Sequence, residues 1–230
     1  MFKVANYDNS SFEIQEIISN IYSTNPTELN MIHDVRRDLY NNDPVRRLDG
    51  TTEWIKEADT KFHKCFYSFL NSDKGSVIFD WYYSFIENCV SGWFDESFLY
   101  QKSPSFRIHL PNLQAIQKWH YDSDKDHGHP LWEINFHVPI TDCFGSNAIW
   151  IESVPGLRDY SPIELNTNQY AIFDGNRCMH GNKLNKTGCT RISFDFRIIP
   201  FRSYNKDIIK HSATTKRKFI IGEYYELFEK

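Results

Sequence analysis

The sequence contains few cysteines, and those it has are not spaced for a structural role. There are five in 230 residues, an odd number, and no two of them form a Cys-x-x-Cys pair. Neither a disulfide framework nor a zinc ribbon is therefore predicted, and a reducing, cytoplasmic compartment is expected. The five are Cys65, Cys89, Cys143, Cys178 and Cys189.

An excess of positive charge and long hydrophobic runs are also absent. Lys and Arg number 26 against 30 Asp and Glu, for a net charge of -4, and no basic tract is long enough to neutralise a row of phosphates. No uncharged apolar run approaches the roughly 20 residues that span a bilayer. The start, MFKVANYDNSSF, lacks the pattern of a leader peptide. We expect an unprocessed, soluble protein with no nucleic-acid or membrane partner; the composition does not indicate its oligomeric state.

What the sequence does contain is ordinary globular composition with many aromatic residues. Hydrophobic residues make up 40% and charged residues 24%, and aromatic residues reach 16%, with 18 Phe and 13 Tyr. Aromatic side chains are equally suited to a core and to an enclosed pocket, and composition does not separate the two uses. Because no internal repeat or low-complexity linker interrupts the chain, residues 1–230 are expected to form a single domain.

Residues 1–95 are predicted to be helical. Ser10 and Glu13 have the spacing of a capping box, and apolar residues then recur at the intervals that place them on one helix face. The apolar positions of the four expected helices are Ile14, Ile17, Ile18 and Ile21; Leu29, Ile32, Val35 and Leu39; Trp54, Ala58, Phe62, Cys65, Phe66 and Phe69; and Ile78, Tyr82, Phe85, Ile86 and Cys89.

Residues 104–201 change to the period of β-strands. Short segments rich in β-branched and aromatic residues alternate with turn sequences: FRIHL, WEINFHVPI, NAIWIE, QYAIFD and TRISFDFRII. This pattern predicts an α+β protein with a mainly β core, a double-sheet jelly roll, and N-terminal helices that cover one of its sheets. Residues 202–230 end in KFIIGEYYELF, which is apolar enough to pack back on the body.

The strongest local signal is His120-x-Asp122 in the segment WHYDSD. Residues i and i+2 of an extended strand point to the same face, so an imidazole and a carboxylate converge there. Two such residues alone are more often a solvated turn, but His180 follows a later strand and offers a third ligand. Two histidines and one carboxylate on one side of a metal leave the opposite positions open, as in non-haem iron(II) sites.

Arg191 and Ser193 follow His180 and are expected to share a strand face. A guanidinium grips a carboxylate through two parallel hydrogen bonds, and a neighbouring hydroxyl can donate a further one. We therefore predict that this pair binds the distal carboxylate of a dicarboxylic acid. Arg197 is the competitor, but six residues at about 3.3 Å each carry it roughly 20 Å along the strand. We expect that to be too far for a cosubstrate bound to the same metal.

These parts, in this order, resemble those of Fe(II)/2-oxoglutarate dioxygenases. With the flanking segments WHYDSDKDHGHPLWEINFHVPITDCFGSNAIWIESVPGL and NRCMHGNKLNKTGCTRISFDFRIIP, the likeness narrows to the StrG-like oxygenases, over roughly residues 104–201 and weakly in GEYYE near the end. The resemblance implies a double-stranded β-helix of the cupin kind, Fe(II) as the metal, and 2-oxoglutarate and O2 as cosubstrates.

Further candidates come from strand alternation. In WEINFHV, alternation places Glu133, Asn135 and His137 on one face, which either looks into the barrel or is exposed to solvent. If it looks inward, Asn135 binds a carboxylate of 2-oxoglutarate, and Glu133 and His137 lie on the substrate side or behind the ligands. Arg107 and His109 share a face of FRIHL, where a substrate-binding role competes with a structural one.

The segment from Asp124 to His129 complicates the choice of ligands. Its acidic residues and histidines resemble the start of a calcium loop, but His127 stands where that loop requires glycine. We interpret the segment as a polar lid beside the site.

The function predicted is a dioxygenase that hydroxylates, or otherwise oxidises, a small-molecule substrate of specialised or sugar-linked metabolism and releases succinate and CO2. Two alternatives stay open: a non-redox metal-dependent cupin, such as an isomerase or hydrolase, and a non-catalytic jelly-roll binding module.

Overall fold

The computed structural model describes residues 2–8, 13–41, 60–113, 119–207, 210–212 and 216–230. Its α-helices are α1 (Ile14–Tyr22), α2 (Ile32–Val35), α3 (Arg37–Asn41), α4 (Lys61–Leu70) and α5 (Ser76–Phe85), and α5 continues as a π-helix over Ile86–Val90. Its strands are β1 (Lys3–Asn6), β2 (Phe98–Gln101), β3 (Ser105–His109), β4 (Ile134–Pro139), β5 (Ile149–Ile151), β6 (Ser161–Ile163), β7 (Gln169–Phe173), β8 (His180–Asn182), β9 (Arg191–Pro200) and β10 (Tyr225–Phe228). Short 3-10 helices cover Pro26–Met31, Ser91–Trp93, Gly145–Asn147 and Phe201–Ser203.

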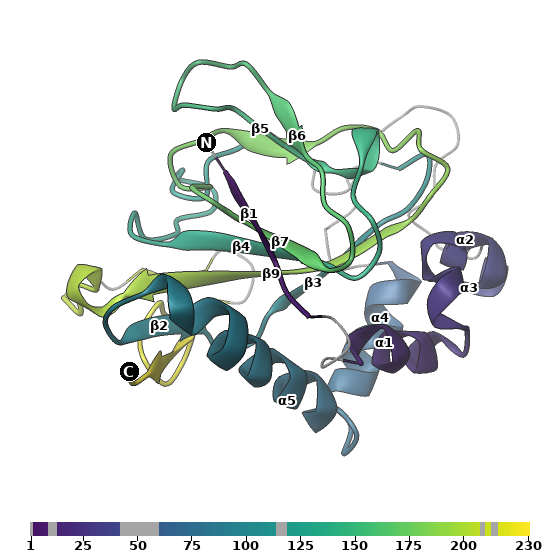
Figure 1. Ribbon diagram of the computed structural model, residues 1–230, viewed down its shortest axis with the longest axis horizontal. Helices are drawn as coiled ribbons and strands as arrows, with labels where there is room; N and C mark the ends of the chain where they lie inside the picture. The colour runs from purple at the N-terminus through teal and green to yellow at the C-terminus, as the bar shows by residue number, and fades with distance from the viewer. Residues whose placement is uncertain (1, 9–12, 42–59, 114–118, 208–209, 213–215) are drawn as a thin grey trace.

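The strands form two antiparallel sheets. The major sheet has the order β1-β7-β4-β9-β2-β10, and β3 also pairs with β9; the minor sheet has the order β6-β5-β8. In Figure 1 the minor sheet lies above the major one and helices α1, α4 and α5 lie below it. The helices therefore cover one face of the major sheet, as predicted, and the chain is a mixed α+β protein. Among the described residues the strands do not close into a barrel.

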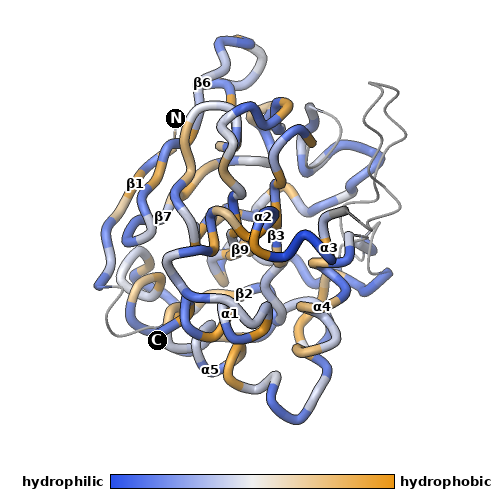
Figure 2. Tube along the Cα trace, turned by 90° about the vertical axis from the view of Figure 1, so that its right-hand side faces the viewer, coloured by the Kyte–Doolittle hydropathy of each residue, from blue (hydrophilic) through white to orange (hydrophobic). Residues whose placement is uncertain are grey.

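The main hydrophobic core lies between the helices and the major sheet. Phe66 of α4 stacks on Phe106 of β3 with ring centroids 4.0 Å apart, and Trp81 of α5 lies 4.9 Å from Phe194 of β9. Helices α4 and α5 each carry hydrophobic and hydrophilic residues, as Figure 2 shows. Much of the aromatic content thus belongs to this core.

Strand alternation then fixes where the polar residues of the sheet lie. In β9 the core contains Ile192, Phe194, Phe196 and Ile198, so Arg191, Ser193, Asp195 and Arg197 take the opposite face. A second apolar cluster joins β7 to the minor sheet through residues such as Ala171, Phe173, Ile149 and Ile151. The polar face of β9 therefore lies on the side of the major sheet that the minor sheet covers.

The N-terminal part contains more than the predicted helices. Strand β1 pairs with β7, and β2 pairs with both β9 and β10. The second expected helix is broken into the 3-10 helix Pro26–Met31 and the short α2 and α3, because Arg36 leaves the helical region with φ -108° and ψ 56°. Ser10, Trp54 and Ala58 lie outside the described residues; helix α4 begins after Thr60, whose hydroxyl accepts a hydrogen bond from the His63 backbone N–H.

The C-terminal segment returns to the major sheet. Strand β10 pairs with β2, and Phe219, Tyr224 and Tyr225 pack with Leu99 and Ile199 in a cluster of their own. All five cysteines lie in the described part of the chain, and none is in a disulfide. Within that part, no helix is long and apolar enough to cross a membrane.

Candidate metal centre

His120, Asp122 and His180 lie together, although they come from distant parts of the chain. One donor atom from each falls within 4.8 Å of the others, and all three residues are buried. The backbone produces this convergence: His120 and His180 exchange N–H···O hydrogen bonds of 3.0 Å as an isolated bridge, and the Asp122 N–H donates to the Gly175 carbonyl at 2.9 Å. The predicted grouping of these three side chains is present.

The donor atoms have the chemistry that a divalent metal needs. Asp122 Oδ1 lies 3.5 Å from His120 Nε2 and 3.7 Å from His180 Nε2. His180 Nδ1 lies 3.1 Å from the Cys178 carbonyl oxygen, which only an N–H can satisfy. This contact places the proton of a neutral His180 on Nδ1 and leaves the lone pair on Nε2, the atom that faces the carboxylate.

Asp122 is held as an anion through its other oxygen. Its Oδ2 accepts hydrogen bonds from Asn135 Nδ2 at 2.7 Å and from Arg197 Nε and Nη2 at 3.1 and 2.9 Å. Burial alone would raise the pKa of Asp122, but the Arg197 guanidinium and the neighbouring histidines hold that pKa well below its usual range. The charged carboxylate therefore directs Oδ1 towards the two imidazoles.

His180 is neutral over the physiological range. Burial lowers its pKa to about 4, and this effect outweighs the attraction of the Asp122 carboxylate. A neutral imidazole is the form that binds a metal. With two imidazole nitrogens, one carboxylate oxygen and no thiol among them, the set fits non-haem iron(II) and does not resemble the four-ligand, cysteine-rich sites of structural zinc.

Arg191 lies on the same side of the major sheet and reaches the minor sheet. Its Nη1 donates to the Asn147 carbonyl at 2.8 Å and to Asn182 Oδ1 at 3.0 Å. Asn182 is two residues from His180 on β8, so the two share a face about 7 Å apart. Ser193 is fully buried, and its hydroxyl has no hydrogen-bond partner among the described residues.

The expectation that Arg197 lies too far away for a cosubstrate bound to the same metal is wrong in its distance, because the Arg197 guanidinium contacts Asp122 directly. The roughly 20 Å was measured along the strand from Arg191, whereas Asp122 meets Arg197 and His180 of β8 across the space between the sheets. Arg197 therefore contacts Asp122 of the triad, and Arg191 contacts Asn182, which lies two residues after His180.

The predicted inward face of β4 is buried, so the solvent-exposed alternative is wrong for Glu133, Asn135 and His137. Asn135 binds Asp122 with its amide nitrogen and accepts a hydrogen bond from the Gly175 N–H at 3.2 Å. Its contact with 2-oxoglutarate stays a prediction, and the structure shows it supporting Asp122. Glu133 accepts from His129 Nδ1 at 2.7 Å.

His137, Arg107 and His109 are held by protein groups. Asp195 contacts His137 Nδ1 at 2.5 Å and accepts from Arg107 Nε at 3.0 Å. His109 lies between two carbonyls, those of Asn147 at 3.3 Å and Leu113 at 3.0 Å. These contacts fit the structural interpretation of Arg107 and His109, and their substrate-binding role stays a prediction.

The segment from Asp124 to His129 forms a turn beside the triad. Asp124 Oδ1 accepts from the backbone N–H groups of Asp126 and His127, each at 2.9 Å. The His127 ring stacks on the His120 ring with centroids 4.2 Å apart. Within the described residues this segment adds no further metal-binding cluster to the triad. Its role as a lid stays a prediction.

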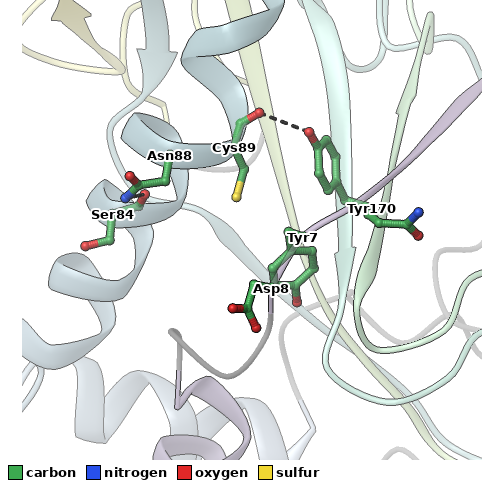
Figure 3. A pocket seen from close by; sticks show the side chains of 7 residues that line it. Tyr7, Asp8, Ser84, Asn88, Cys89 and Tyr170 are labelled. Atoms are coloured by element: carbon green, nitrogen blue, oxygen red, sulfur yellow. Dashed lines mark hydrogen bonds between the residues drawn. The ribbon is translucent and has the colours of Figure 1, made fainter.

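A separate cavity of 520 Å³ lies on the helical side of the major sheet. Asn6, Tyr7, Asp8, Ser84, Asn88, Cys89 and Tyr170 line it. In Figure 3 the Tyr170 hydroxyl, which belongs to β7, donates to the Cys89 carbonyl at the end of the helical segment that follows α5. Tyr170 packs in the helix-facing core, so this cavity and the triad lie on opposite faces of the major sheet.

Sequence reasoning missed several residues of this centre. Asp195 shares the strand parity of Arg191, and that parity could have placed it on the inner face. Asn182 has the same parity relation to His180. Gly175 and Tyr225 carry no sequence signal of this kind, because their contacts depend on how distant segments meet.

The comparisons with known proteins give a family. No family model matches the sequence. The chain is 33% identical over 170 residues to the streptomycin biosynthesis protein StrG of Streptomyces griseus, and the alignment covers 74% of this chain and 77% of StrG. The chain belongs to the StrG family. In this StrG-family chain, the His-x-Asp…His triad has the two imidazoles and one carboxylate that are typical of non-haem iron(II) sites.

Solved structures show weaker likenesses. AviO1 from Streptomyces viridochromogenes Tue57 has 14% identity and a TM-score of 0.44, with 89% of this chain and 91% of AviO1 covered. A prolyl hydroxylase from Trichoplax adhaerens has 11% identity and a TM-score of 0.44, with 88% and 84% covered. The carbocyclase SnoK from nogalamycin biosynthesis has 12% identity and a TM-score of 0.36, with 45% and 51% covered. The assignment to a family rests on the StrG alignment.

Proposed function

We propose that this StrG-like oxygenase hydroxylates, or otherwise oxidises, an unactivated C–H bond of a small-molecule substrate, with release of succinate and CO2 from 2-oxoglutarate. The observation that carries the proposal is the buried triad. Asp122 Oδ2 accepts three hydrogen bonds from protein donors, and Asp122 Oδ1 faces the Nε2 atoms of His120 and His180. The scaffold that we propose is a double-stranded β-helix built from the two sheets as one domain.

His120, Asp122 and His180 are the proposed iron ligands. Bound iron(II) supplies the redox chemistry with dioxygen, and the chain supplies the ligand set and its surroundings. His120 and His180 contribute imidazole nitrogens, and Asp122 contributes a negative charge that partly balances the metal. Three protein ligands leave coordination positions for 2-oxoglutarate and dioxygen.

Arg191 and Ser193 are the proposed partners of the distal carboxylate of 2-oxoglutarate. This proposal is supported by the hydrogen bond from Arg191 to Asn182, which lies two residues from His180 on β8 and shares a face with it. The buried Ser193 hydroxyl is supported as a second donor, because buried hydroxyls normally have a partner. A buried guanidinium strengthens charge-assisted hydrogen bonds to a carboxylate.

The substrate class follows from the family alone. StrG is a streptomycin biosynthesis protein, and we propose that this chain acts in specialised or sugar-linked metabolism. Burial of the triad supports an enclosed reaction site, in which the protein excludes water and orients the substrate. Among the predicted substrate-side residues, Arg107, His109, Glu133 and His137 each already have a protein partner.

The proposal predicts that Asp122→Ala abolishes tight iron(II) binding and uncoupled succinate formation together, because the variant loses the charged ligand. Iron(II) binding would be measured anaerobically, and succinate would be measured after 2-oxoglutarate and air are added without substrate. Asp126→Ala, in the neighbouring exposed turn, is the matched control and should behave like the unsubstituted protein. Stoichiometric iron(II) binding by a variant that lacks both His120 and Asp122 would contradict the ligand assignment.

A further inference from the structure

A buried chain of polar contacts connects the C-terminal strand to the proposed metal site. The Tyr225 hydroxyl of β10 donates to Glu133 Oε1, Arg197 Nε lies 3.5 Å from Glu133 Oε2, and Arg197 donates through Nε and Nη2 to Asp122 Oδ2. We call these four residues, Tyr225, Glu133, Arg197 and Asp122, the Tyr225 relay. All four are at most 8% exposed.

The charges of the relay explain why each member needs the others. Asp122 and Glu133 are two buried carboxylates that share one guanidinium, since Arg197 Nε lies 3.1 Å from Asp122 Oδ2 and 3.5 Å from Glu133 Oε2, and burial of an unpaired charge is costly. Glu133 also receives hydrogen bonds from Tyr225 and from His129 Nδ1. These two neighbours hold Glu133 in place, and Glu133 in turn attracts the same nitrogen of Arg197 that donates to Asp122.

The geometry at Asp122 gives Arg197 a specific effect. Its Nε and Nη2 both donate to the same oxygen of Asp122, Oδ2, and the Asn135 amide donates to that oxygen as well. With Oδ2 held in this way, the carboxylate can present Oδ1 alone to a metal. If Arg197 moved, Asp122 could rotate and offer both oxygens, which would change the number of ligand atoms.

The C-terminal strand holds Tyr225 in place by packing. Phe219, Tyr224 and Tyr225 form one buried cluster with Leu99 and Ile199, and the Phe219 ring lies 4.8 Å from that of His129. The C-terminal segment therefore supports both of the residues that bind Glu133: β10 carries Tyr225, and Phe219 packs against His129.

We propose that Arg197 is a positioning residue for Asp122, and that β10 completes the iron site by holding Arg197 through Tyr225 and Glu133. This inference rests on the proposed iron ligands and goes beyond them, because it assigns a function to the C-terminal strand. Replacing a residue that hydrogen-bonds to a metal ligand typically lowers the affinity for the metal by about 10- to 100-fold.

The test measures iron(II) affinity anaerobically in four forms of the full-length protein. Arg197→Lys keeps the charge but cannot place two donors on Oδ2, and it should weaken iron(II) binding by about 10- to 100-fold. Tyr225→Phe keeps the ring and removes only the hydroxyl, and it should weaken binding by about 10-fold. Tyr22→Phe is the matched control, since it removes the hydrogen bond of another buried tyrosine, to the Phe62 carbonyl in the helical layer. It should bind iron(II) like the unsubstituted protein.

A second measurement separates positioning from general damage. The visible absorption of the cobalt(II)-loaded protein reports the number of ligand atoms, so Arg197→Lys and Tyr225→Phe should change that spectrum and Tyr22→Phe should not. Suppose that Arg197→Lys and Tyr225→Phe both bind iron(II) normally and keep the cobalt spectrum, while Asp122→Ala binds no metal. The proposed role of the Tyr225 relay would then be wrong, and the assignment of the iron ligands would still hold. If the unsubstituted protein binds no iron(II), or Asp122→Ala binds it normally, the proposed function itself fails.

Discussion

At the scale of single residues, the polar face between the sheets is organised by three arginines with different partners. Arg197 contacts Asp122, Arg107 contacts Asp195, and Arg191 donates to the neutral oxygens of Asn147 and Asn182. Two of the guanidiniums therefore stabilise carboxylates of the protein itself. Arg191 is the one whose contacts connect β9 to the strand that carries His180.

Arg191→Ala should weaken 2-oxoglutarate binding and leave iron(II) binding nearly unchanged. Losing a charge-assisted pair in a desolvated pocket costs about 2 to 5 kcal/mol, which corresponds to roughly 30-fold or more in affinity. Anaerobic equilibrium titrations with each ligand would measure both effects. Arg197→Lys is the reverse control, because its loss should fall mainly on iron(II). A large loss of 2-oxoglutarate affinity only in Arg197→Lys would contradict the role of Arg191.

Sequence patterns located most residues of the centre but not their connections. The spacing of His120 and Asp122 and the alternation of β4 and β9 are local properties, and they predicted which side chains share a face. The distance expected for Arg197 was wrong because it was measured along one strand, whereas the site lies between two sheets. Side chains from both sheets meet there, and the sequence alone does not give the distances between residues of different sheets.

At the scale of secondary-structure elements, short strands and backbone bridges assemble the centre. Strand β8 is the three-residue segment HGN, and glycine and asparagine are rare in strands, so its sequence gives no strand signal. Strand β6 contains Pro162 and lies at the edge of the minor sheet, where a missing N–H is tolerated. Five strands were predicted because their sequences are rich in β-branched and aromatic residues, namely β3, β4, β5, β7 and β9. Strand β1 lies where only helices were expected, and β2 lies between the predicted helical part, residues 1–95, and the predicted β core, residues 104–201.

Gly175 should be intolerant of a side chain. It follows β7, its carbonyl accepts from Asp122, and a Cβ added there would lie 2.8 Å from Asn135 Nδ2. Gly175→Ala should therefore displace Asn135 from Asp122 and weaken iron(II) binding by about 10-fold. Gly92→Ala is the matched control, because nothing lies within 4 Å of its added Cβ. Equal iron(II) affinities in the two variants would refute this function of Gly175.

At the scale of the whole molecule, the two faces of the major sheet have different tasks. One face packs the aromatic core against the helices, and the other carries buried charges, the triad and the proposed cosubstrate site. The cavity at Tyr7 and Tyr170 is on the helical face and takes no part in the centre. The expectation that residues 1–230 form a single domain stays a prediction, as does the absence of nucleic-acid and membrane partners.

The buried histidines should make stability depend on pH in the mildly acidic range. Burial, followed by the nearby Arg191 charge, lowers the pKa of His109 from 6.5 to about 3. Below pH 6.5 the unfolded chain takes up a proton that folded His109 does not, so the free energy of unfolding falls as the pH drops towards 3. The slope contributed by one such group approaches about 1.4 kcal/mol per pH unit.

Denaturant unfolding of the metal-free protein at pH 7, 6 and 5 would measure this slope. His109→Gln should show a shallower fall than the unsubstituted protein, because one titrating group is removed. His180 and His137 also have pKa values lowered chiefly by burial, so part of the slope should remain. The same slope in both proteins would contradict the account of His109.

The most direct test of the central claim is an anaerobic titration of the iron(II)-loaded protein with 2-oxoglutarate, followed by visible absorption. The account predicts a weak charge-transfer band that saturates with one 2-oxoglutarate per iron. The band should require much higher 2-oxoglutarate concentrations in Arg191→Ala and be missing in Asp122→Ala. A protein that binds iron(II) at the triad but develops no band at any 2-oxoglutarate concentration would contradict the account and favour a metal-dependent cupin without redox chemistry.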